Sequence, residues 1–148
     1  MSASICEMES KLQVLEFVKL KFPRLIPLNL IESVKGRTFT PEQFYFYQEN
    51  QVGNPHNYLY ALLDEQKKIQ GYLWAESNSL DNSLFINTFS IDKEYWGKGT
   101  AIEKAKEFLR ILKEKSKATH VFWVTTNEKF FLKQGFKKSR NVLMEYVD

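Results

Sequence analysis

Several residue types are scarce in this chain of 148 residues, and each scarcity excludes a class of protein. The single cysteine, Cys6, excludes an internal disulfide and a zinc site built on cysteine pairs, and with two histidines we expect no metal centre. The longest uncharged run, residues 50–63, is polar and shorter than the ~20 apolar residues that span a bilayer. No apolar block follows a basic N-terminus, so we expect no secretory signal, no membrane partner and a cytoplasmic location.

The remaining composition is that of a globular protein, with 43% hydrophobic and 26% charged residues. Because domains run at ~100–200 residues, we expect residues 1–148 to form a single domain. Charge is unevenly distributed, since residues 1–92 hold 8 basic and 11 acidic side chains whereas residues 93–140 hold 13 and 5. The basic half indicates either a polyanionic ligand or a solvated, lysine-rich helix face.

Apolar periodicity and turn residues predict alternating helices and strands. Thr40-Pro41-Glu42-Gln43 is typical of a helix start, with a capping hydroxyl, a first-turn proline and a glutamine three residues after the cap. We expect helices at residues 9–20, 41–51, 101–117 and 127–134, and strands at residues 57–64, 69–77, 84–91, 120–125 and 142–147. This order predicts an α/β (α+β) fold with a mixed, mostly antiparallel central sheet and helices on both faces.

Two glycines, Gly97 and Gly99, lie where a strand gives way to the long helix. The first turn of a helix has unpaired amides and a partial positive charge, and glycine lets a phosphate approach the backbone closely. The spacing is neither that of a Walker loop nor that of the dinucleotide fingerprint. The segment therefore indicates a phosphate or pyrophosphate site, with a plain glycine-rich turn as the alternative.

Residues 91–101, Ile-Asp-Lys-Glu-Tyr-Trp-Gly-Lys-Gly-Thr-Ala, resemble the acyl-CoA signature of the GNAT acyltransferase superfamily. Residues 127–136, Asn-Glu-Lys-Phe-Phe-Leu-Lys-Gln-Gly-Phe, are similar to the short helix that ends in Gly-Phe in that family. The element order fits over residues 9–147, and the two motifs lie at the separation typical of the family.

The resemblance implies direct transfer of an acetyl group from acetyl-CoA to an amine, without a metal. In this family the sheet splays between the fourth and fifth strands, and the pantetheine arm lies in the gap. Main-chain groups of residues 89–91 would then face the pantetheine, and the amides of residues 97–101 would hold the pyrophosphate. The resemblance assigns acetyl-CoA binding to Phe89, Ser90, Ile91, Trp96, Gly97, Lys98, Gly99, Thr100, Ala101, Asn127, Phe130, Phe131 and Lys133.

The chain departs from the family pattern at two informative positions. Trp96 replaces the usual arginine or glutamine, so that side-chain contact is lost. Phe131 stands where the family often has a tyrosine that protonates the leaving thiolate. A thiol has a pKa near ~8.5, so water or another hydroxyl can serve, and weak or absent catalysis is the alternative.

The acceptor amine must lose a proton before it attacks. A lysine-like amine with a pKa of ~10.4 is ~3.4 units from neutrality at pH 7, which costs ~4.6 kcal/mol, so a general base is expected. Our candidate is Glu76, with a solvated strand-end acid as the alternative and His56 as a second candidate; we expect His120 to pack. Six aromatic residues are expected either to line an acceptor pocket or to pack in the core: Phe44, Tyr45, Phe46, Tyr47, Tyr58 and Tyr60.

Two other function classes compete with the acetyltransferase. Trp96 and Phe131 favour a non-catalytic acyl-CoA-binding or protein-interaction module on the same fold. The basic block and the aromatics could suit a small nucleic-acid-binding domain. The aromatics cluster at residues 39–60, in the acidic half, whereas the lysines cluster after residue 93, so we do not expect nucleic acid as a partner. The acceptor and the acyl chain length stay open, and a homodimer is allowed but not required.

Overall fold

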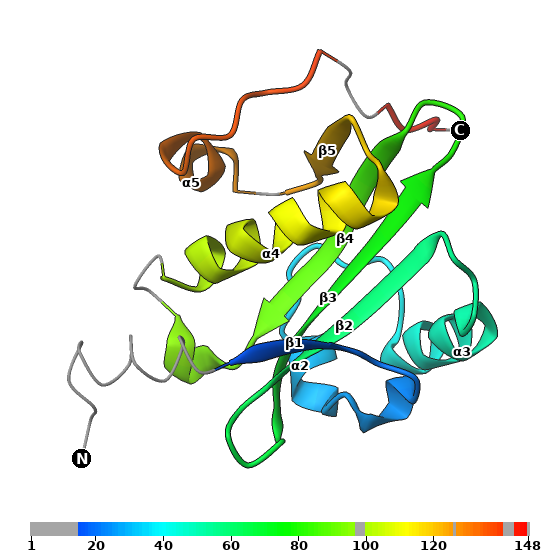
Figure 1. Cartoon of the computed structure of the whole chain (residues 1–148), viewed down its shortest axis with the longest axis vertical. Helices are drawn as coiled ribbons and strands as arrows, with labels where there is room; N and C mark the ends of the chain where they lie inside the picture. Colours follow the sequence, from blue (N-terminus) through cyan, green and yellow to red (C-terminus); the bar gives the residue numbers. More distant parts are fainter. Residues whose placement is uncertain (1–14, 97–99, 126, 141–143, 148) are drawn as a thin grey trace.

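The computed structural model describes residues 15–96, 100–125, 127–140 and 144–147. Its centre is a five-stranded sheet in the order β1-β2-β3-β4-β5 (Figure 1). The strands are β1 Glu16–Lys19, β2 Asn57–Leu63, β3 Ile69–Asn78, β4 Ser83–Ile91 and β5 His120–Trp123. Neighbours from β1 to β4 are antiparallel, and β5 is parallel to β4. The predicted mixed, mostly antiparallel sheet is therefore confirmed.

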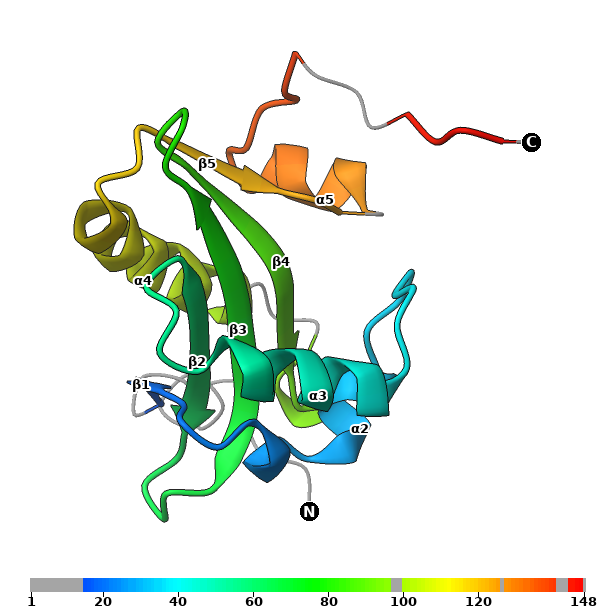
Figure 2. The ribbon, with the colours of Figure 1, turned by 90° about the vertical axis from the view of Figure 1, so that its right-hand side faces the viewer.

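Helices cover both faces of the sheet, as predicted. Figure 2 shows α2 and α3 on one face and α4 on the other. The α-helices are α2 Leu28–Glu32, α3 Pro41–Gln51, α4 Thr100–Ser116 and α5 Glu128–Lys133, and the 3-10 turns are η1 Pro23–Leu25 and η2 Lys93–Tyr95. None of the helices in the described residues is long and apolar enough to cross a membrane.

Alternation along β3 divides the core into two layers. Leu73 and Ala75 are buried against α4, in one cluster with its Leu112. Tyr72 and Trp74 face the opposite way, toward α2 and α3. Because successive strand residues point to opposite faces, Glu76 follows Trp74 onto the face that carries α3.

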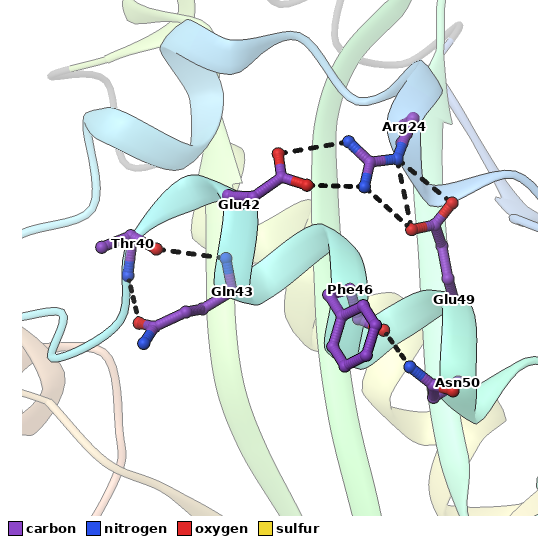
Figure 3. Close-up of polar contacts among 7 residues, drawn as sticks. All are labelled: Arg24, Thr40, Glu42, Gln43, Phe46, Glu49 and Asn50. Carbon is purple, nitrogen blue, oxygen red and sulfur yellow. Dashed lines mark hydrogen bonds and ion pairs between the residues drawn. The ribbon is translucent and has the colours of Figure 1, made fainter.

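Local capping fixes the start of α3. The Gln43 amide donates to Thr40 Oγ1 at 3.1 Å, and the Thr40 amide donates to Gln43 Oε1 at 2.8 Å (Figure 3). This is the reciprocal capping box that the sequence predicts, and such an N-cap contributes about 1 kcal/mol.

Arg24 of η1 ties that turn to α3. Its guanidinium donates to both oxygens of Glu42 and to both oxygens of Glu49 (Figure 3). The hydrogen bonds from Arg24 lower the pKa of Glu42 below its ordinary value. Each of the three guanidinium nitrogens thus bonds a carboxylate of α3.

Two sequence predictions are wrong at the ends of the chain. The helix predicted for residues 9–20 is a strand at Glu16–Lys19, and residues 1–14 lie outside the described part. Pairing with the edge of β2 overrides the helical spacing, and Phe17 stacks on Phe108 with ring centroids 4.0 Å apart. Residues 144–147 of the predicted last strand are exposed and form no strand in the described chain, while residues 141–143 fall outside it.

Candidate functional site

Strands β4 and β5 part halfway along β4. They pair only from Ser83 with His120 to Ile86 with Trp123, after which β4 continues to Ile91. Figure 2 shows β5 turning away from β4 toward α5. Over its second half, β4 therefore has a described strand partner on one side only, which is β3.

A β-bulge lies at the point of parting. Trp74 pairs with Thr88 and Ala75 pairs with Ile86, so Asn87 is the extra residue of β4. A bulge bends its strand and redirects a side chain. Here the Asn87 amide reaches across to donate to Glu76 Oε1 at 2.7 Å.

The antiparallel ladder sets which main-chain groups of β4 face the gap. The Asp92 amide donates to the Gln70 carbonyl at 2.7 Å, so this pair bonds directly across the ladder. Bonded and non-bonded pairs alternate, hence Ser90 turns its main-chain groups toward β3 while Phe89 and Ile91 turn theirs away. The Trp96 indole confirms this direction, because its N–H donates to the Ile91 carbonyl at 2.9 Å.

Ser90 is used within the fold. Its hydroxyl donates to the Leu30 carbonyl of α2 at 2.7 Å. A Cβ added at Gly71 of β3 would lie 2.6 Å from the Ser90 carbonyl oxygen. The strands pass so closely there that only glycine fits at position 71 without a shift. Of the three residues predicted to offer main-chain contacts, Phe89 and Ile91 thus remain as candidates.

A cavity of about 1080 Å³ opens along the free edge of β4. Its size reaches the upper end of typical ligand sites, at ~300–1,000 Å³. Eight of the sequence-predicted site residues line it: Glu76, Phe89, Ser90, Ile91, Trp96, Ala101, Phe130 and Phe131. The structure therefore brings the predicted base and much of the predicted donor site to one cavity.

An aromatic cluster forms the wall on the side of β5 and α5. The Trp123 ring lies 4.9 Å from Phe131 and 6.0 Å from Phe89, measured between centroids. Phe136 packs against Phe131 at 5.1 Å. The position where the family often has a tyrosine is thus filled by an apolar ring in ring-to-ring contact.

Other predicted donor residues do not line the cavity. Asn127 caps α5 by accepting from the Phe130 amide at 3.3 Å, and Lys133 is exposed on that helix. Residues Gly97, Lys98 and Gly99 lie outside the described residues, as does the side chain of Thr100, the first residue of α4. The phosphate site at this helix start stays a prediction.

Glu76 lies at the α3 end of the cavity and is held by two donors. The Tyr47 hydroxyl donates to Oε2 at 2.6 Å, and Asn87 donates to Oε1. Burial, together with the bond to Glu76, raises the pKa of Tyr47 to about 12, so the phenol stays protonated at neutral pH. Each carboxylate oxygen keeps a second lone pair for a ligand.

The other sequence candidates lie elsewhere. His56 Nδ1 lies 3.0 Å from Ser77 Oγ and does not line the cavity, and His120 is exposed beside Phe122. Most of the predicted aromatic group packs in the core. Phe44, Tyr45 and Tyr60 are buried there, Tyr58 packs against it, and Phe46 is 67% exposed. Of this aromatic group, Tyr47 alone is seen to reach Glu76 in the described residues.

Within the described chain, no three His, Cys, Asp or Glu side chains cluster to hold a metal.

Sequence reasoning missed the loop that joins α2 to α3. Residues 33–39 line the cavity, with Lys35 and Arg37 among them, and Phe39 packs on Trp74 with centroids 6.1 Å apart. The loop has no periodicity that would reveal this. Trp74 could have been found, because it lies two residues before Glu76 and shares its face of the strand.

The profile of the Acetyltransferase (GNAT) family matches residues 27–136. This match covers most of the chain, and the protein belongs to that family. A search of curated proteins found no match.

Solved structures share the fold at low sequence identity. One, titled a "possible acetyltransferase" from Clostridium difficile 630, is 13% identical with a TM-score of 0.69, over 91% of this chain and 98% of the other. Glucosamine-6-phosphate N-acetyltransferase from Arabidopsis thaliana is 18% identical with a TM-score of 0.62, over 90% and 99%. An aminoglycoside N-acetyltransferase in complex with CoA is 10% identical with a TM-score of 0.66, over 90% and 94%.

Proposed function

We propose that the protein transfers an acetyl group directly from acetyl-CoA to the nitrogen of an amine. The observation that carries the proposal is the parted edge of β4, which leads along one cavity to the Glu76 carboxylate. The family supports acetyl transfer, and the CoA complex of a structural neighbour supports the donor.

The donor arm would bind as an extra strand beside β4. The main-chain groups of Phe89 and the Ile91 amide face the gap and match the amides of pantetheine. Each such hydrogen bond contributes ~0.5–1.5 kcal/mol. The Ile91 carbonyl is already used by Trp96, so this chain offers one acceptor fewer along the edge. The first turn of α4, which begins at Thr100, would receive the pyrophosphate.

The acceptor end supplies the base. Glu76, oriented by Tyr47 and Asn87, takes the proton of the amine directly or through one water. The amine nitrogen then bonds to the thioester carbon, the nitrogen of this adduct loses its second proton to water, the carbon–sulfur bond breaks, and the thiolate leaves. With Phe131 in place of a hydroxyl, the thiolate takes its proton from water. The products are the N-acetylated amine and coenzyme A.

Phe131 also favours a second candidate, a protein that binds acyl-CoA without turning it over. The two candidates are separated by incubating the protein with acetyl-CoA and a panel of amines. We expect release of free thiol that depends on the amine, and a product heavier by one acetyl group in mass spectrometry. Calorimetric binding of coenzyme A without thiol release across the panel would favour the second candidate. A thermal shift with oligonucleotide and none with coenzyme A would contradict both.

A further inference from the structure

Charge is distributed unevenly inside the cavity. Among the described residues, three charged side chains line it: Lys35, Arg37 and Glu76. Glu76 belongs to β3, whereas the two cations come from the loop between α2 and α3. Figure 2 shows this loop on the face of the sheet opposite α4.

Two contacts connect Arg37 to the strand that carries the base. Its Nη1 donates to the Phe39 carbonyl at 2.7 Å, and the Phe39 ring packs on Trp74. Trp74 and Glu76 are two residues apart on one strand face, which places their Cα atoms ~7 Å apart. One short chain of contacts thus links the guanidinium to the strand segment that carries the carboxylate.

The described residues give neither cation of the loop a carboxylate partner. Arg24 of the same helical layer contrasts with Arg37, because Glu42 and Glu49 neutralise it. A guanidinium uses one N–H for the Phe39 carbonyl and keeps four others in a planar fork that matches a carboxylate or a phosphate. A guanidinium on the cavity wall with these donors available can bind an anionic ligand.

We infer that the acceptor is a small amine that also carries a phosphate or carboxylate group. This inference rests on the proposed function. The amine lies at Glu76, and the anionic group binds Arg37 with help from Lys35. Trp74 and Phe39 form the apolar wall between the two ends. The opposite charges orient the molecule, because the reverse placement would set an ammonium against the guanidinium and an anion against the carboxylate.

The test compares matched amines with acetyl-CoA as donor. O-phosphoethanolamine and β-alanine carry a phosphate and a carboxylate, and ethanolamine carries neither. We expect kcat/KM to be at least ~10-fold higher for one or both anionic amines than for ethanolamine. Arg37→Gln should remove that preference by raising KM for the anionic amines. Lys113→Gln, an exposed lysine at the far end of α4, is the matched control and should change nothing.

A binding readout distinguishes failure of the inference from failure of the proposed function. O-phosphoethanolamine and β-alanine are each titrated into protein saturated with coenzyme A, and we expect heat that Arg37→Gln abolishes for at least one of them. Equal rates for charged and neutral amines, better acetylation of an acidic peptide, or no binding of either anion while coenzyme A binds would overturn the inference. Failure to bind coenzyme A would overturn the proposed function itself.

Discussion

Replacing Glu76 by glutamine is expected to lower kcat/KM for acetyl transfer roughly 100- to 1,000-fold at pH 7, within the usual range for removal of a general base. The glutamine keeps the length of the side chain and still accepts from the Tyr47 hydroxyl, but it takes no proton from the amine. Steady-state kinetics with a fixed amine measures the change. Coenzyme A affinity should stay the same, because Glu76 lies at the opposite end of the cavity from the predicted pyrophosphate site.

The pH profile separates a base from a structural role. As pH approaches the pKa of the amine, solvent supplies more neutral amine, so the difference between wild type and Glu76→Gln should shrink. Tyr47 should add no inflection below pH 10, because its pKa of about 12 keeps it protonated there. Glu65→Gln, at an exposed glutamate of the β2–β3 turn, is the control and should leave the profile unchanged. A deficit that is constant with pH would show that Glu76 only supports the local structure.

Replacing Ala101 by leucine is expected to weaken coenzyme A binding about 30-fold. Ala101 lies in the first turn of α4 and lines the cavity. The three additional carbons of leucine would occupy part of the volume in which we expect the donor to bind. Overpacking of this kind costs ~1–3 kcal/mol, and ~2 kcal/mol corresponds to about 30-fold. Leucine is nearly as good a helix former as alanine, so the helix should persist. Calorimetric titration with coenzyme A measures the loss.

The control for that titration is Lys113→Leu, which adds an apolar side chain at an exposed position of the same helix. It should bind coenzyme A like the wild type. If the Ala101→Leu protein has an unchanged melting temperature and unchanged affinity, the donor does not pass the first turn of α4.

Most of the sheet could be predicted because its signals are local. The capping residues at Thr40 and Gln43 marked the start of α3, and β-branched and aromatic runs marked β2, β3 and β4. The first strand could not be predicted, since its apolar spacing also fits a helix and the choice depends on pairing with β2. At the other end, residues 144–147 (Met-Glu-Tyr-Val) satisfy a strand pattern but form no strand in the described chain.

The site was predicted in part for the same reason. Glu76 and the β4 edge followed from motifs and their order, whereas the partners of Glu76 depend on distant chain segments. Tyr47 belongs to α3 and is 29 residues from Glu76 in the sequence. Asn87 is directed toward Glu76 by a β-bulge that no local sequence pattern predicts. Lys35 and Arg37 line the cavity because of where the loop between α2 and α3 lies relative to the sheet, which no local sequence pattern predicts.

Amide hydrogen exchange with and without coenzyme A tests most directly the claim that the donor binds along the free edge of β4. In the unliganded protein, the Phe89 and Ile91 amides should exchange faster than the Ser90 amide, which faces β3. Saturating coenzyme A should slow exchange at Phe89 and Ile91 and leave Ser90 unchanged. Unaltered exchange at both Phe89 and Ile91, in protein shown by calorimetry to be saturated, would contradict the account.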